Sequence, residues 1–190
     1  FIDNVAPSPR EAKPEKTTDG KELAYDPTKP TVLFVFKSHL EPNLGKLTYF
    51  KVISGEVTSN SELINSQTGA VERFHQIFIM DGKNRTPVDK LVAGDIGATL
   101  KLKDTFTNQT PCAKGFEVTI EPINYPEARI RTAVVAQSKN DDEKMGEVLS
   151  KIHQEDPTLN VAYSKELRQL IVSGQGEMHL TVCKWFLDNM

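Results

Sequence analysis

The sequence has few cysteines and no long apolar run, and each shortage excludes a class of protein. Cys112 and Cys183 are the only cysteines among 190 residues, and they stand far apart in the chain. A disulfide framework and a zinc site are therefore both disfavoured, and we expect two buried thiols. No stretch approaches the roughly 18 to 20 consecutive apolar residues of a membrane-spanning helix. The first residues also lack the pattern of a secretory signal, so the sequence predicts a cytoplasmic protein with no membrane partner.

The sequence also lacks a strong excess of charge of one sign. Its 23 Lys and Arg stand against 26 Asp and Glu, a net charge of −3, so attraction of the whole chain to nucleic acid is excluded. The charge is unevenly spread, because residues 31–115 carry +2 and residues 116–190 carry −4. Any contact with a phosphate backbone is therefore expected on the first of these segments. The candidate side chains are Lys83, Arg85, Lys101 and Lys103, for which a solvated strand face is an equally good interpretation.

Motifs that carry chemistry are missing as well. The sequence contains no Gly-x-x-x-x-Gly-Lys-Ser/Thr loop and no Gly-x-Ser-x-Gly. Gly174-Gln-Gly176 resembles the start of a dinucleotide fingerprint, but His179 stands where the third glycine belongs, so a tight turn between a strand and a helix is the better interpretation. The sequence thus predicts no catalytic residue, no metal ligand and no cofactor for this chain.

The texture of the chain changes near residues 30 and 120. Residues 1–30 hold five of the eleven prolines and predict a linker. Residues 31–120 contain short apolar runs broken by turn residues, which predict a β-barrel with strands near 31–36, 46–54, 74–80 and 96–102. In the last of these, Ile96, Ala98, Leu100 and Leu102 are expected to face the core, with the intervening residues in water.

Residues 121–190 follow a different order. A strand at 130–136 precedes a helix whose apolar residues Met145, Val148, Leu149 and Ile152 share one face and which ends before Asp156-Pro157. Strands at 159–163 and 169–173 and a second helix marked by Met178, Val182, Trp185 and Phe186 follow. The order β-α-β-β-α predicts an α+β ferredoxin-like domain that lacks its last strand. The strand at 130–136 should then be an exposed, apolar edge, and we expect this fragment either to self-associate through it or to show disorder around it.

Four motifs in register carry a family resemblance. They are the run from His39 to Gly55, Gly94-Asp-Ile-Gly-Ala98, Glu155-Asp-Pro-Thr158 and Gly174-Gln-Gly-Glu-Met-His-Leu180. In this order they resemble the second and third domains of elongation factor G, the translational GTPase that drives translocation on the ribosome. The resemblance implies a translation-factor β-barrel followed by a ferredoxin-like domain, with residues 1–30 leading from an absent GTPase domain that would hold GTP and magnesium.

The resemblance also implies partners. The family's second domain rests on small-subunit ribosomal RNA, and its third domain contacts a small-subunit protein and the GTPase domain of its own chain, near the fusidic acid pocket. The residues that match at this interface are Asp156, Pro157, Thr158, Gly174, Gly176, Glu177 and His179. The family commonly has Gly-Met-Gly-Glu-Leu-His-Leu where this chain has Gln175 and Met178. A divergent elongation factor G-like paralogue therefore stays open.

The resulting hypothesis is a non-catalytic fragment that docks on the ribosome and couples GTP hydrolysis elsewhere in its parent to translocation. A fragment of a tetracycline-resistance ribosomal protection protein, or of another ribosome-associated GTPase, is the nearest alternative. From other classes, a stand-alone RNA-binding barrel and a self-contained enzyme are the alternatives, and the missing motifs disfavour the enzyme.

Overall fold

The computed structural model describes residues 5, 8–9, 11–41, 45–136 and 139–189, with side chains in the first helix of the second unit described from residue 144 onward. The chain divides into two compact units, residues 1–123 and 124–190, which we call the barrel unit and the α+β unit. The division lies three residues beyond the predicted boundary at 120 and 121.

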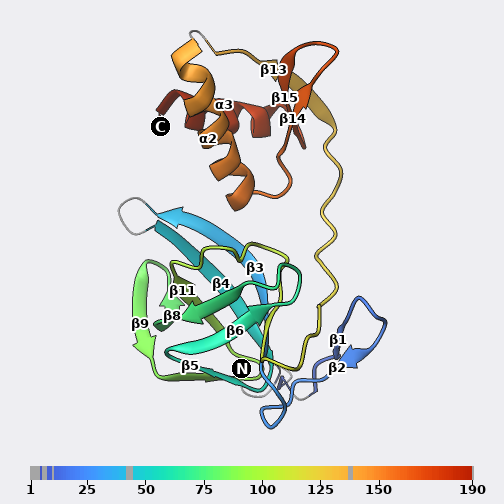
Figure 1. Ribbon diagram of the computed structural model, residues 1–190, viewed down its shortest axis with the longest axis vertical. Coiled ribbons are helices and arrows are strands. Elements are labelled where there is room, and N and C mark those ends of the chain that lie inside the picture. Colours follow the sequence, from blue (N-terminus) through green and yellow to red (C-terminus); the bar gives the residue numbers. More distant parts are fainter. Residues whose placement is uncertain (1–4, 6–7, 10, 42–44, 137–138, 190) are drawn as a thin grey trace. The chain divides into compact units, whose positions relative to one another are not determined.

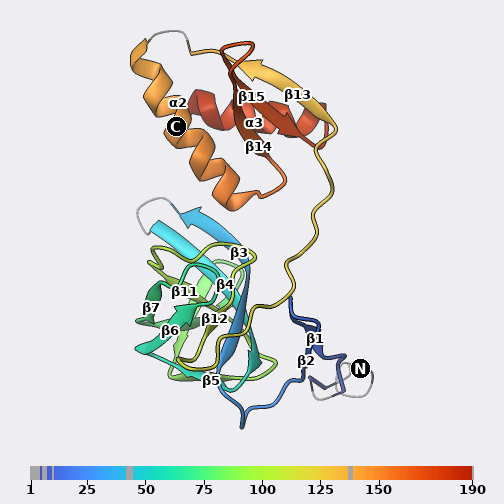
Figure 2. The ribbon, with the colours of Figure 1, turned by 45° about the vertical axis from the view of Figure 1, so that its right-hand side comes forward.

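The barrel unit is built on one curled sheet of eight strands (Figures 1 and 2). In spatial order these are β7 (Val71–Phe74), β6 (Ser61–Asn65), β12 (Pro111–Cys112), β3 (Val32–Glu41), β4 (Gly45–Ser54), β11 (Ile96–Leu100), β8 (Ile77–Asp81) and β9 (Asn84–Val88). A second pair, β5 (Glu56–Thr58) and β10 (Lys90–Val92), is antiparallel. The core inside the curl contains Phe50 and Phe74, whose rings meet edge to face at 5.6 Å. The predicted barrel-type fold is confirmed.

The orientation predicted for the strand at 96–102 is correct for Ala98, Lys101, Leu102 and Lys103 and wrong for Ile96, Gly97 and Thr99. Ile96 is 57% exposed, whereas Thr99 on the face expected to be wet is fully buried. Gly97 packs against Leu91 and Phe50 of the core, and the Thr99 hydroxyl donates to the Gln76 carbonyl. Gly97, Ala98 and Thr99 are buried in succession, so both faces of β11 are covered there, and simple alternation does not identify the inner one.

The segment predicted as a linker is ordered in its second half. β1 (Glu15–Lys16) pairs with β2 (Glu22–Leu23), and the Leu23 and Tyr25 side chains enter a second core cluster with Ile53. The Tyr25 hydroxyl donates to Glu15 and accepts from Lys51. Burial and then the hydrogen bond to Glu15 raise the pKa of Tyr25. Residues 15–25 therefore belong to the barrel unit. The many prolines of residues 1–30 had favoured a linker instead.

The α+β unit has a three-stranded antiparallel sheet in the order β13 (Ile130–Val134), β15 (Gln169–Gly174), β14 (Asn160–Ser164). The helices α2 (Lys139–Glu155) and α3 (Glu177–Asn189) pack on one face of it (Figure 1). Leu149 and Ile152 of α2 are buried there as predicted, and α2 ends directly before Asp156. The β-α-β-β-α order is confirmed, while the cap predicted at residues 140–143 lies outside the described side chains.

The four apolar residues that marked the second helix do not all face the core. Met178, Val182 and Trp185 are 76%, 45% and 60% exposed, whereas Cys183 is buried and Phe186 is packed against the core. The helix holds two apolar stripes, and the sheet covers the one that contains Cys183. Both cysteines are free and buried as expected, and burial raises the pKa of each thiol. No helix in the described ranges is long and apolar enough to cross a membrane.

Candidate functional site

The residues predicted for the interface of the α+β unit come from two turns that the fold brings together. One is the turn between α2 and β14, which holds Asp156, Pro157 and Thr158. The other is the turn between β15 and α3, where Gly174 ends the strand, Gly176 lies in the turn, and Glu177 and His179 belong to the first turn of the helix. The Nε2 atom of His179 lies 3.0 Å from Oδ2 of Asp156, which ties the two turns. We call Asp156, Thr158, Gly174 and His179 the turn clasp.

Hydrogen bonds fix both ends of the clasp. The backbone N–H and the hydroxyl of Thr158 donate to Oδ1 of Asp156 at 2.9 and 2.6 Å. On the other side, the Gln175 N–H donates to Nδ1 of His179 at 3.1 Å. Since Nδ1 is an acceptor in this arrangement, the proton of the neutral ring lies on Nε2 and points to Asp156. Burial alone raises the pKa of Asp156, but the hydrogen bonds from Thr158 and the contact with His179 outweigh it and lower that pKa.

Gly174 is required at its position by the histidine ring. A Cβ atom there would lie 3.0 Å from Nδ1 of His179 and 3.1 Å from Cδ2 of Leu180, tighter than ordinary contacts. Gly176 has nothing within 4 Å of such an atom, and its carbonyl accepts the first helical bond of α3, from Leu180. Glu177 follows in the first turn of α3, where a carboxylate is favourable. The clasp is therefore a rigid, half-exposed polar surface.

Gln175 explains one departure from the family pattern. Its side-chain amide donates to the Pro126 carbonyl at 2.8 Å, and the Arg129 N–H donates to the Gly174 carbonyl at 2.9 Å. The segment that enters the unit is thus attached to the clasp turn. Met178, the other departure, is 76% exposed, and nothing in the described part of the chain explains it.

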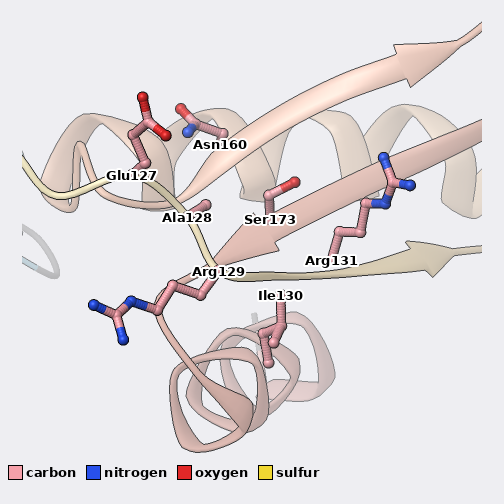
Figure 3. A pocket seen from close by; sticks show the side chains of 7 residues that line it. All are labelled: Glu127, Ala128, Arg129, Ile130, Arg131, Asn160 and Ser173. Carbon is pink, nitrogen blue, oxygen red and sulfur yellow. The ribbon is translucent and has the colours of Figure 1, made fainter.

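A hollow of about 530 Å³ lies beside β13 (Figure 3). Arg131 lines it on the same side as Ser173 and Asn160, while Ile130 points to the opposite side of the strand (Figure 3). β13 pairs only with β15 within the described residues, so the predicted free edge is present there. Self-association through this edge stays a prediction.

The basic residues predicted on the barrel unit fall into two places. Lys83 and Arg85 line one cavity of about 490 Å³, which we call the barrel cavity and which is also lined by Lys37, His39, Glu41, Tyr49 and Gly82. Lys101 and Lys103 do not line it. The Lys103 N–H donates to the carboxylate of Glu72, which also accepts from the Asp104 N–H, so Lys103 lies beside an acidic group. The four cations therefore do not share one patch around this cavity.

Sequence reasoning missed Lys37 and Tyr49 in this cavity. They are direct cross-strand partners on β3 and β4, but the two strands were predicted without a register, so the pair was not visible. The His39, Glu41 and Lys37 side chains share one face because they alternate along β3. In the described ranges, no group of three or more His, Cys, Asp or Glu is arranged to hold a metal ion.

Comparison with known proteins agrees with this division into units. Residues 30–112 match the family model "Elongation factor G domain 2", and residues 125–189 match "Elongation Factor G, domain III". A crystal structure of the protein ttk003000868 from Thermus thermophilus superposes with a TM-score of 0.73 over 84% of this chain at 24% identity, which shows the shared fold. This chain spans only 24% of the length of that structure. The two matched ranges follow each other in family order and together span well over half of the sequence, so the chain belongs to the elongation factor G family and comprises its second and third domains.

Proposed function

We propose that this chain is the docking and relay part of an elongation factor G-like translational GTPase. The barrel unit rests on small-subunit ribosomal RNA, and the α+β unit transmits the state of the parent's GTPase domain, so that GTP hydrolysis is coupled to translocation in the cytoplasm. GTP and magnesium belong to that domain, and this chain supplies no catalytic group. The matches to the second and third domains of the family support this proposal.

The turn clasp is the observation that carries the relay part of the proposal. A relay surface must keep its shape while its partner changes, because packed elements switch between discrete arrangements and do not deform continuously. The clasp meets this need, since Asp156 is held by Thr158 and His179 is held by both Asp156 and Gln175. His179 is largely buried, with 19% of its side chain exposed, whereas Asp156 is 42% exposed and offers carboxylate oxygen to a partner.

The docking part is tested by sedimentation of the purified 190-residue chain with small and large ribosomal subunits. We expect the chain to pellet with small subunits and to be released as salt rises, because phosphate contacts weaken with salt. Equal pelleting with both subunits, or none with the small one, would contradict docking.

The relay part is tested in the complete parent protein with His179→Ala. Loss of the histidine frees the two turns, so we expect ribosome binding to persist while translocation per GTP hydrolysed falls. His75→Ala is the matched control, since His75 is an exposed histidine of the barrel unit. A variant that translocates like the unchanged protein would refute the relay. A parent that instead restores synthesis inhibited by tetracycline would establish the ribosomal-protection alternative.

A further inference from the structure

We propose that the barrel cavity binds a phosphate group, held between the Lys37 and Lys83 ammonium groups. This inference deepens the proposed ribosome docking and rests on it, since it names the chemical group that the barrel unit recognises and the residues that do so. Such a phosphate comes either from an RNA backbone or from a free phosphorylated molecule, and the two sources are separated by the experiment below.

The first observation is the convergence of donors from two strands and a turn. Lys37 lies on β3, Tyr49 lies opposite it on β4, and Lys83 follows Gly82 in the turn between β8 and β9. Directly opposed residues of antiparallel strands have Cβ atoms about 5 Å apart, and the Lys37 and Tyr49 side chains both line the barrel cavity. Donors that arrive from several directions suit a tetrahedral anion with many acceptor oxygens.

The second observation is the charge balance inside the cavity. Arg85 is neutralised by Glu41, with Nη2 and Oε2 3.1 Å apart and only 24% and 25% of the two side chains exposed. Neither Lys37 nor Lys83 has a carboxylate at ion-pairing distance in the described part of the chain. Two cations without a carboxylate partner among the described residues therefore line one cavity of a chain whose net charge is −3.

The third observation is the arrangement that holds the cavity open. The Arg85–Glu41 pair ties β9 to β3, which are not neighbours in the sheet, and so fixes the hairpin that carries Lys83. Gly82 takes a φ of 56° in this two-residue turn, and a Cβ atom there would meet nothing within 4 Å. The hairpin thus presents Lys83 at an unobstructed rim. Tyr49 offers a ring as well as a hydroxyl, which suits a nucleotide whose base stacks beside its phosphate.

The experiment uses the 190-residue chain, with a fluorescein-labelled single-stranded RNA of ten nucleotides and inorganic pyrophosphate as separate probes. We expect Lys37→Gln to weaken RNA binding about tenfold at low salt and to reduce the slope of log affinity against log salt by about one. Lys83→Gln should behave alike. Lys114→Gln is the matched control, because Lys114 is exposed on the same unit outside the cavity and its loss removes the same charge. Its effect should stay below about twofold.

Pyrophosphate is followed by ¹⁵N-resolved NMR of the same chain. We expect amide signals of Lys37, Tyr49 and Gly82 to shift together and to stop responding in Lys37→Gln. If pyrophosphate shifts these signals but Lys37→Gln does not affect RNA binding, the site stands and its ligand is a free phosphorylated molecule. Equal weakening by Lys37→Gln and Lys114→Gln, with no localised shift, overturns it.

The two proposals fail separately. If Lys37→Gln pellets with small subunits as well as the unchanged chain does, the proposed docking function stands. Phosphate binding by this cavity then plays no part in docking. If the chain does not pellet but shows the localised pyrophosphate shifts, the phosphate site stands and the docking function is refuted.

Discussion

Replacing Gly174 by alanine tests whether the histidine of the clasp is held as tightly as the structure indicates. The new methyl carbon would lie 3.0 Å from Nδ1 and 3.4 Å from Cγ of the His179 ring, so the ring must move by a few tenths of an ångström. Such a movement lengthens the bond from Gln175 N–H and the contact with Asp156, each part-buried and worth about 1 kcal/mol. Alanine regains part of this by restricting the unfolded chain, about 0.4–1 kcal/mol. We expect a net destabilisation of about 1 kcal/mol.

The only tryptophan makes the assay specific for the α+β unit. Trp185 lies on α3 with its ring 5.2 Å from that of Phe186, so its fluorescence reports unfolding of this unit. With a urea slope of about 1 kcal/mol per molar for a unit of this size, the midpoint should fall by about 1 M. Gly146→Ala is the matched control, because Gly146 lies within α2 with nothing near its Cβ position and should gain about 0.5–1 kcal/mol.

The reasoning is refuted if Gly174→Ala raises the midpoint as Gly146→Ala does. A double-mutant cycle sharpens the test, because the cost of Gly174→Ala should shrink when His179→Ala has already removed the ring. A cost that is the same in both backgrounds would show that Leu180, and not the histidine, makes the position tight.

Three further predictions concern stability. The pKa of Asp156 is lowered in the folded state, so its contribution to the free energy of unfolding is complete above the unfolded-state pKa near 3.9 and is lost as pH falls through the folded-state pKa. Asp156→Asn should therefore reduce the loss of stability below about pH 4, measured by Trp185 fluorescence. Gly97→Ala places a methyl 2.2 Å from Cδ1 of Leu91 and should cost the barrel unit about 1–3 kcal/mol, measured by amide exchange. Leu23→Ala should cost about 2–5 kcal/mol by the same exchange measurement, and unchanged exchange would show that residues 15–25 do not stabilise the barrel.

The sequence predicts a helix or strand correctly where one face of that element is buried and the other is exposed to water. α2 shows this, since Leu149 and Ile152 recur at helical spacing and are buried, and Asp156-Pro157 follows its end. The buried face of an element cannot be predicted where both of its faces are covered or where it carries two apolar stripes. β11 has buried residues on both faces, and α3 buries the stripe around Cys183 while leaving that around Trp185 exposed. Neither choice can be made without knowing the neighbouring elements.

The site follows the same logic. Asp156 and His179 are 23 residues apart, and nothing in their spacing shows that they pair, so they were predicted only from the family resemblance. Lys37 was missed because its importance depends on strand register, which local periodicity does not determine. Lys103 was grouped with Lys83 by sign of charge alone, although backbone contacts with Glu72 separate its surroundings from the cavity.

Gln175 joins two features that have been described separately. Its side chain holds the Pro126 carbonyl in the stretch where the chain enters the α+β unit, and its backbone N–H holds the His179 ring. A force applied to that stretch therefore acts on Gln175 through the Pro126 carbonyl. It reaches the His179 ring through the Gln175 backbone N–H. The stretch that enters the α+β unit and the clasp are thus coupled through the turn between β15 and α3.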